Sequence, residues 1–159
     1  MPQAFEATTQ YSLVRLVHVA NPEAAYTLFS HHGSMSVLYV AIGSAIGGVA
    51  RFLLGGALQR SNSSFPYGTL TVNILGAFAI GLVARYALDA PDFSPELRLF
   101  ITTGLCGGFT TFSAFSLETV ELMERGHSPT ALTYVAASLT LGLLATAAGI
   151  TLAKNLAQG

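Results

Sequence analysis

Charged side chains are scarce in this sequence. Asp, Glu, Lys and Arg together make up 9% of its 159 residues, whereas an ordinary soluble domain has about 25%. Hydrophobic residues make up 52%. This balance excludes an ordinary soluble domain and indicates an integral membrane protein.

Groups that carry enzyme chemistry are also few. The single cysteine, Cys106, excludes an internal disulfide and a multi-cysteine metal site. The chain has no phosphate-binding loop, no metal-ligand spacing, no histidine inside a predicted span and no nucleophile with a plausible base. We therefore expect neither an enzyme nor a nucleic-acid-binding protein.

Long uncharged runs define the membrane-spanning segments. Residues 61–84, 99–117 and 126–153 contain no Asp, Glu, Lys or Arg, and residues 37–58 have the same apolar character apart from Arg51. Each run reaches the roughly 18 to 20 residues that a helix needs to cross about 30 Å of hydrocarbon. We predict an all-α integral membrane fold with four transmembrane helices, at about residues 37–58, 67–88, 95–125 and 129–153.

The first 34 residues differ from the rest of the chain. They contain two of the prolines, Arg15 and three of the four histidines. Their apolar patch, at residues 11–20, is too short to span a membrane, and no cleavage site follows it as a signal peptide requires. We expect an N-terminal extension that is flexible or an artefact of the assigned start, with Met35 as the alternative start and residues 35–159 as the membrane domain.

The third predicted helix contains glycines and hydroxyls within an apolar segment. It covers around 30 residues, which is more than one bilayer crossing requires. Gly104, Gly107 and Gly108 each cost about 1 kcal/mol of helix propensity relative to alanine. We expect a break near residues 106–111, and broken backbone is tolerated in a bilayer only where it is buried in protein or lines a polar cavity. The stretch from Gly104 to Glu118 is therefore the candidate functional centre.

Polar side chains share faces with small residues on the other three helices. Arg51 lies within a span, and such an arginine faces a water-filled cavity or a partner unless it snorkels to the interface. Thr69 and Asn73 are four residues apart, and Asn73 either lines a polar path or only joins two helices by a hydrogen bond. A stripe on the fourth helix recurs at every fourth position: Tyr134, Ser138, Gly142 and Thr146.

The interior of the predicted bundle offers hydrogen-bond donors. Phe112 and Phe115 are three residues apart on one face, a spacing that apolar packing alone can explain. Glu118 follows them and could lie at a pore mouth. The other polar groups within the spans are amides, hydroxyls and one arginine, and no Asp or Glu lies at the centre of a span. An interior rich in donors and free of acids suits a small anion.

The sequence resembles the Fluc/CrcB family of fluoride channels. Three motifs carry the resemblance, in the family's order and spacing, within roughly residues 37–153: Gly47-Gly48-Val49-Ala50-Arg51-Phe52, Gly68-Thr69-Leu70-Thr71-Val72-Asn73-Ile74-Leu75-Gly76, and residues 104–116. The resemblance implies a dual-topology homodimer of four-helix subunits in a lipid bilayer, in which the second copy is inverted. Two antiparallel fluoride pores would each be built by both subunits.

The resemblance also implies roles for individual residues. Asn73 would donate to fluoride, and Phe112 and Phe115 would line the pore with the positive edges of their rings. The backbone carbonyls of Gly107 and Thr110 would hold a structural sodium ion at the dimer axis. The remaining polar residues divide between the fluoride path, with Thr69, Ser113, Tyr134 and Ser138, and the vestibule, with Arg51 and Glu118.

Two positions depart from the family pattern. Ala114 stands where members commonly carry Thr, so one hydroxyl near the phenylalanines is missing. Gly142 stands where the fourth helix often has Ser. These departures bear on the conduction rate and the detailed ion path, and the family assignment does not depend on them.

Basic residues are almost balanced between the two sides of the membrane. With four spans, one side carries Arg15, Arg85, Arg98 and Lys154, and the other carries Arg60 and Arg125, with Arg51 if it lies toward that end. Orientation follows an excess of Lys and Arg in short cytoplasmic loops, and four against three is hardly an excess. Charge alone leaves open whether copies insert both ways up or one or two residues orient the chain. The balance favours a homodimer over a pair of unlike subunits.

Together these features predict passive, selective fluoride efflux across the inner (plasma) membrane, which protects the cell from fluoride. One alternative is a small dual-topology transporter of the multidrug type, which needs a carboxylate in its first helix that residues 37–58 lack. The other is an assembly subunit without transport, which does not explain Arg51, Asn73 and the broken third helix together.

Overall fold

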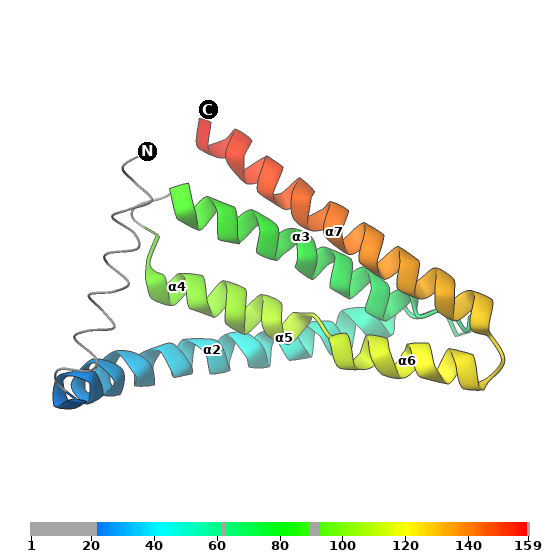
Figure 1. Ribbon diagram of the computed structural model, residues 1–159, viewed down its shortest axis with the longest axis horizontal. Helices are drawn as coiled ribbons and strands as arrows, with labels where there is room; N and C mark the ends of the chain where they lie inside the picture. The colour runs from blue at the N-terminus through cyan, green and yellow to red at the C-terminus, as the bar shows by residue number, and fades with distance from the viewer. Residues whose placement is uncertain (1–21, 62, 90–92, 159) are drawn as a thin grey trace. The chain divides into compact units, whose positions relative to one another are not determined.

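In a computed structural model, residues 22–61, 63–89 and 93–158 are described, with side chains for residues 35–61, 63–87 and 93–156. All regular structure in these ranges is helical (Figure 1). The elements are α2 (Pro22–Leu58), α3 (Tyr67–Asp89), α4 (Pro95–Leu99), the π-helix η1 (Phe100–Cys106), α5 (Gly107–Phe109), α6 (Phe112–Glu124) and α7 (Ser128–Gln158). The chain divides into two compact units, Met1–Val37 and Leu38–Gly159. The second unit contains every residue assigned a functional role.

Four helical stretches are long and apolar enough to cross a membrane: Met35–Leu58, Tyr67–Ala87, Pro95–Glu124 and Ser128–Leu156. The predicted all-α, four-span architecture is confirmed. Helix α2 begins at Pro22 rather than near residue 37, with proline at a position that suits a helix start. Residues 22–34 of the predicted extension are thus helical, and residues 1–21 lie outside the described part of the chain.

The third span is broken at two threonines. Thr110 (φ −83°, ψ 158°) and Thr111 (φ −150°, ψ 117°) are extended, so α5 ends just before them and α6 begins just after them. This position falls within the predicted range of 106–111. Gly104, Gly107 and Gly108 all lie within helical segments, and the extended residues are the two threonines that follow them. β-Branched threonine favours extended backbone, and the break occurs there.

Two of these glycines allow α2 to approach the third span closely. A Cβ added at Gly104 would lie 3.0 Å from the Cα of Gly43, and one added at Gly108 would lie 2.5 Å from the carbonyl oxygen of Ser44. Any side chain there would push the two backbones apart. Small residues at such crossings are typical of helix packing in membranes.

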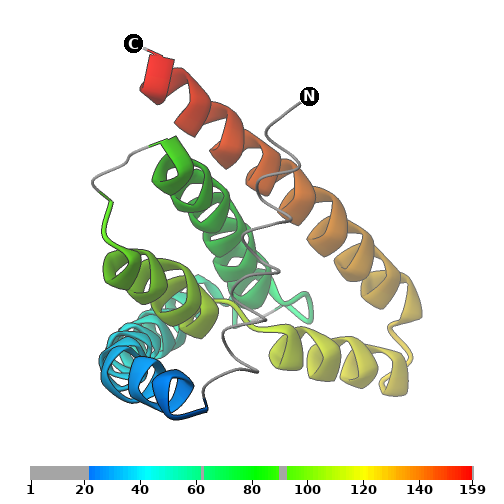
Figure 2. The same ribbon diagram turned by 60° about the vertical axis from the view of Figure 1, so that its left-hand side comes forward.

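Helices α3 and α7 lie side by side (Figures 1 and 2). A Cβ at Gly81 of α3 would collide with the carbonyl of Thr146, and one at Gly149 of α7 would collide with the carbonyl of Phe78. The two backbones are therefore in direct contact. Gly126, which has a positive φ of 78°, closes the turn between α6 and α7: its N–H donates to Met123 O, and the N–H of His127 donates to Leu122 O, as in a Schellman motif.

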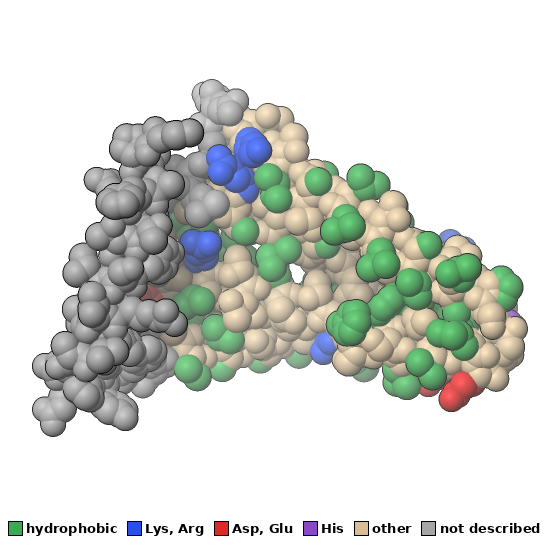
Figure 3. Space-filling view, viewed as in Figure 1, with side chains coloured by type: hydrophobic (Ala, Val, Ile, Leu, Met, Phe, Trp, Pro, Cys, Tyr) green, Lys and Arg blue, Asp and Glu red, His purple; other side chains and the backbone are tan. Residues whose placement is uncertain are grey.

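A small core lies where α3, α6 and α7 meet. Tyr134 is fully buried there, and the cluster comprises Leu122, Ala131, Tyr134, Phe65, Leu70 and Phe115. Elsewhere large apolar side chains are exposed, among them Phe52 at 77% and Phe112 at 78%. Figure 3 shows hydrophobic side chains across the visible face of the described residues and few charged ones. Such a surface requires lipid or another protein around it.

Candidate functional site

The break in the third span is held by Asn73. The Asn73 side chain on α3 accepts a hydrogen bond from the Thr111 N–H (2.8 Å) and donates one from Nδ2 to the Thr111 carbonyl (3.1 Å). One amide side chain thus satisfies both backbone groups of a residue that has left the helix. An unpaired backbone group in a bilayer costs several kcal/mol. Asn73 is therefore both a structural partner of the break and a polar group within the span.

The threonine hydroxyls complete this arrangement. Thr111 Oγ1 accepts from the Ala114 N–H at 3.1 Å and caps α6. It also lies 3.1 Å from Ser113 Oγ. Thr110 Oγ1 donates to the Cys106 carbonyl at 3.0 Å. These contacts stabilise the two ends of the broken helix without a continuous backbone ladder.

The same rearrangement frees two carbonyl groups. In a continuous helix the Thr111 N–H would donate to Gly107 O, and the Ala114 N–H would donate to Thr110 O. Here Thr111 donates to Asn73 and Ala114 donates to Thr111 Oγ1. The carbonyls of Gly107 and Thr110 have thus lost their helical donors, and oxygen atoms of this kind are the ligands that hard cations prefer.

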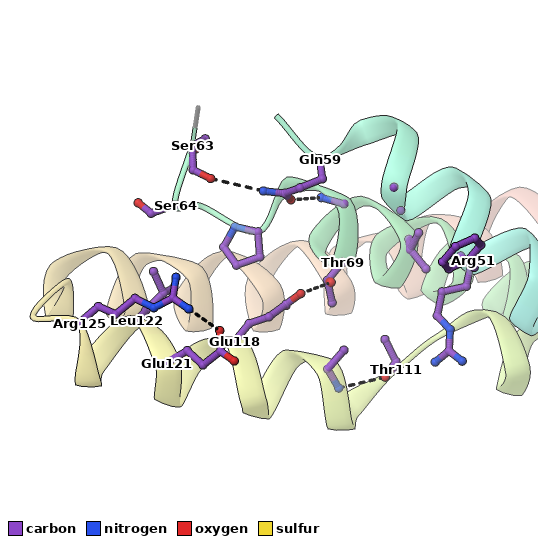
Figure 4. Close-up of a pocket in the computed structure, with 17 residues that line it drawn as sticks. Arg51, Gln59, Ser63, Ser64, Thr69, Thr111, Glu118, Glu121, Leu122 and Arg125 are labelled. Carbon is purple, nitrogen blue, oxygen red and sulfur yellow. Dashed lines mark hydrogen bonds and ion pairs between the residues drawn. The ribbon is translucent and has the colours of Figure 1, made fainter. Parts of the chain in front are cut away.

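Glu118 joins two other helices to α6. Its carboxylate accepts hydrogen bonds from Thr69 Oγ1 of α3 (2.6 Å) and from the Tyr134 hydroxyl of α7 (2.7 Å). Both lengths are typical of hydrogen bonds from a hydroxyl to a carboxylate, which are about 2.5 to 2.7 Å long. Figure 4 shows the Glu118 and Thr69 side chains directed toward each other. In this arrangement both hydroxyl protons face the carboxylate.

The aromatic side chains form a connected row. The Phe112 and Phe115 rings are tilted, with centroids 5.6 Å apart, and Phe115 contacts Tyr134 at 5.2 Å. Tyr134 in turn meets Phe65 edge-on at 5.6 Å. Phe115 is therefore anchored in the core, whereas Phe112 is largely exposed on the described surface.

A first cavity, here called the inner cavity, adjoins the break and has a volume of about 370 Å³. Helices α3 and α7, the broken segment and α6 all contribute to it. Its lining is Asn73, Gly76, Ala77, Ile80, Cys106, Gly107, Thr110, Thr111, Phe112, Phe115, Ser138, Leu139, Gly142 and Thr146. None of these described residues is charged.

The inner cavity contains a hydroxyl that the protein leaves unused. Ser138 Oγ is buried and has no hydrogen-bond partner among the described residues. Thr146, two turns further along α7, instead donates to the carbonyl of Gly142 at 3.1 Å. A buried hydroxyl without a partner is costly, so Ser138 is suited to a ligand that enters the cavity.

A second cavity, here called the mouth cavity, has a volume of about 440 Å³ and lies between the end of α2, the start of α3 and α6 (Figure 4). Its charged and amide side chains are Arg51, Gln59, Glu118, Glu121 and Arg125. Arg125 and Glu121 form an exposed ion pair of 3.3 Å, and Arg51 lies at the other end of the cavity. Charged walls of this kind hold water and attract ions.

The structure divides the residues predicted from the sequence between the two cavities. Six of the residues predicted for the fluoride path or the sodium site line the inner cavity: Asn73, Gly107, Thr110, Phe112, Phe115 and Ser138. Arg51, Thr69 and Glu118 line the mouth cavity. Ser113 and Tyr134 are outside the described linings of both. Tyr134, expected along the ion path, is a buried core residue whose hydroxyl reaches Glu118.

Two contributors were not among the predicted site residues. Thr111 is the residue whose backbone pairs with Asn73, and its hydroxyl caps α6; the run Thr110-Thr111 before Phe112 was the available signal. Gln59 donates from Nε2 to Phe65 O (3.2 Å) and accepts from the Gly68 N–H (3.2 Å). It ties the loop at the mouth cavity to α3, and no sequence pattern indicated this.

Comparison with known proteins identifies the family. Residues 38–150 match the family described as CrcB-like protein, Camphor Resistance (CrcB). The chain belongs to the CrcB-like family. A protein of Rhizobium meliloti named "Fluoride-specific ion channel FluC" is 45% identical over 119 residues, which cover 74% of this chain and 95% of the relative. The protein of the same name from Geobacter sulfurreducens is 48% identical over 122 residues, which cover 76% of this chain and 98% of the relative. The one from Chlorobaculum tepidum is 47% identical over 119 residues, which cover 75% of this chain and 94% of the relative.

The match confirms the resemblance seen in the three sequence motifs, since it covers nearly the whole second unit. It also places both cavities and the break within the matched region. Because the relatives are named as ion channels, the prediction that the chain is not an enzyme is confirmed.

Proposed function

We propose that this CrcB-like chain is a fluoride-specific ion channel that allows passive efflux of fluoride. The names of its relatives, which align over nearly their whole length, support the substrate. The observation in the structure that carries the proposal is the inner cavity, whose lining combines the unpartnered Ser138 hydroxyl with Asn73 and two phenylalanine rings. These groups offer hydrogen-bond donors and positive ring edges to an anion.

The chemistry of the inner cavity favours fluoride over a cation. Its described lining contains no carboxylate that would attract a cation or repel an anion. Asn73 Nδ2 has two protons, and the bond to Thr111 uses one of them. The other proton and the Ser138 hydroxyl replace part of the water that fluoride loses on entry. The edges of Phe112 and Phe115 carry partial positive charge, and a narrow passage between them disfavours the larger chloride ion.

The mouth cavity serves as the vestibule. Arg51 attracts the anion from bulk water, while the Glu118 carboxylate is occupied by the hydroxyls of Thr69 and Tyr134. Hydrogen fluoride crosses lipid as a neutral acid and dissociates in a less acidic cytoplasm. A channel in the inner membrane then lets fluoride leave, driven by a potential worth about 2.3 kcal/mol per charge at 100 mV. This efflux protects the cell from fluoride.

The functional unit is an antiparallel dimer with a second, inverted copy. The nearly even distribution of basic residues supports insertion in both orientations. Phe112 and Phe52 are more than three-quarters exposed in the single chain, so apolar surface is available to a partner. Phe112 also lines the inner cavity, so a partner that covers it completes the wall of the pore. Each dimer then contains two antiparallel pores.

A structural sodium ion fits the carbonyls freed by the break. Gly107 and Thr110 have lost their helical donors because Asn73 and the Thr111 hydroxyl have taken them. Two carbonyls from each of two subunits would give four oxygens, a suitable set for a hard cation. Such an ion, held by these carbonyls, would supply fixed positive charge between the subunits and would hold the broken segments together.

Reconstitution into liposomes tests the function. Purified protein in vesicles loaded with potassium fluoride should release fluoride to an ion-selective electrode when a potassium ionophore balances charge, and vesicles loaded with chloride should release little. Empty vesicles measure leakage. Equal release of both anions, or no release above leakage from a folded protein, contradicts a fluoride-specific channel.

A further inference from the structure

We propose that Gly142 limits fluoride passage through the inner cavity, because it leaves a gap in the row of hydrogen-bond donors along α7. This inference rests on the proposed function and concerns the rate-determining part of the path. It makes one residue of this chain responsible for how fast fluoride crosses the cavity.

Gly142 faces open space. It lines the inner cavity, and a Cβ added to it would meet no heavy atom within 4 Å among the described residues outside its own helix turn. Gly149, on the same helix, shows the opposite, since an added Cβ there would lie 2.8 Å from the backbone nitrogen of Leu82. Close packing within the chain therefore explains the glycine at 149 and does not explain the one at 142.

The donors on either side of Gly142 are too far apart for one ion. Ser138 and Thr146 are eight residues apart, or about 12 Å along a helix that rises 1.5 Å per residue. An anion that accepts hydrogen bonds from both sides spans only about 5.5 Å, twice the usual donor–acceptor distance. A hydroxyl at position 142 would divide the interval into two steps of about 6 Å each. Glycine leaves it undivided.

The Thr146 hydroxyl does not offer a free proton at the far side of this gap. Its hydroxyl proton is directed to the Gly142 carbonyl, so the proton is already used by the helix backbone. The Ser138 hydroxyl, by contrast, has no partner among the described residues. An ion that leaves Ser138 toward Thr146 therefore loses a donor before it gains one. In this part of the path only water can replace the missing hydrogen bond.

Three single variants separate a donor effect from a size effect. Gly142→Ser adds a hydroxyl in the open space, Gly142→Ala adds a methyl group without a donor, and Ala148→Ser adds a hydroxyl to an exposed position of α7 outside both cavities. We expect fluoride efflux per reconstituted protein to rise about threefold or more in Gly142→Ser. Efflux should stay the same or fall in Gly142→Ala and should not change in Ala148→Ser.

Alanine also serves as the folding control, since it has higher helix propensity than glycine and the space for its methyl group is open. The inference is overturned if Gly142→Ser is no faster than Gly142→Ala while the unmodified chain conducts fluoride. It is also overturned if both variants lose efflux together with dimer formation in cross-linking, because Gly142 would then be a packing contact with the second copy. Absence of efflux from the unmodified chain would instead contradict the proposed function.

Discussion

The Tyr134 hydroxyl donates a hydrogen bond of 2.7 Å to the Glu118 carboxylate, and this bond links α7 to α6 in the small core of the bundle. Tyr134→Phe removes the bond and keeps the ring contact with Phe115. We expect the free energy of unfolding in detergent to fall by about 1 to 3 kcal/mol. Thr133→Val, which removes an exposed hydroxyl that bonds to Pro129 O in the same helix, is the matched control. An unchanged unfolding curve for Tyr134→Phe would show that Glu118 finds another donor.

Asn73→Asp tests the pairing that holds the break. The variant keeps an oxygen for the Thr111 N–H but places a second oxygen against the Thr111 carbonyl, where Nδ2 now donates. It also adds a negative charge to the inner cavity, which should repel fluoride. We expect efflux to fall by roughly tenfold or more, the effect of about 1.4 kcal/mol on a barrier.

Thr71→Val is a suitable control for Asn73→Asp, because the Thr71 hydroxyl is bonded to Tyr67 O on the same helix and is exposed. It should conduct like the unmodified chain. Full fluoride efflux in Asn73→Asp would remove Asn73 from the ion path and leave it only its role at the break.

The two phenylalanines should behave differently although they are three residues apart. Phe112→Ile should slow fluoride efflux with little change in stability, since the Phe112 ring is largely exposed. Phe115→Ile should both slow efflux and lower stability, because Phe115 also contacts Tyr134 in the core, and an aromatic pair is worth about 0.5 to 1.5 kcal/mol. The measurements that check this are the fluoride efflux rate and the thermal unfolding of each variant. Unimpaired efflux in both would contradict their place in the pore.

Local properties of the sequence explain which parts of this fold were predictable. Span number follows from uncharged length, and the existence of a break followed from a helix too long for one crossing. Its position fell within the predicted range of residues 106–111, but the extended residues are Thr110 and Thr111 rather than the glycines before them, and two of those glycines serve the crossing with α2 at Gly43 and Ser44. That contact joins segments about 60 residues apart in the chain, and helix propensity contains no information about it.

The candidate site, like the fold, was predictable from the sequence only in part. Asn73 was identified from its polar amide within a span, but its partner Thr111 lies 38 residues away and became evident only in three dimensions. The resemblance places Tyr134 on the ion path with Ser138, four residues further along the helix. The structure adds that the Tyr134 ring contacts Phe65 in the core and that its hydroxyl donates to Glu118, contacts that the four-residue spacing does not indicate.

Gly149→Ala tests whether the contact between α3 and α7 depends on a missing side chain. The added Cβ would lie against Phe78 O and 2.8 Å from Leu82 N, both backbone atoms that cannot move as a side chain would. Overpacking of this kind costs about 1 to 3 kcal/mol, and we expect lower thermal stability and a larger aggregated fraction in detergent. Gly56→Ala is the matched control, because an added Cβ there meets no described atom within 4 Å and alanine gains helix propensity. If the two alanine variants unfold at the same temperature, α3 and α7 are not packed backbone to backbone.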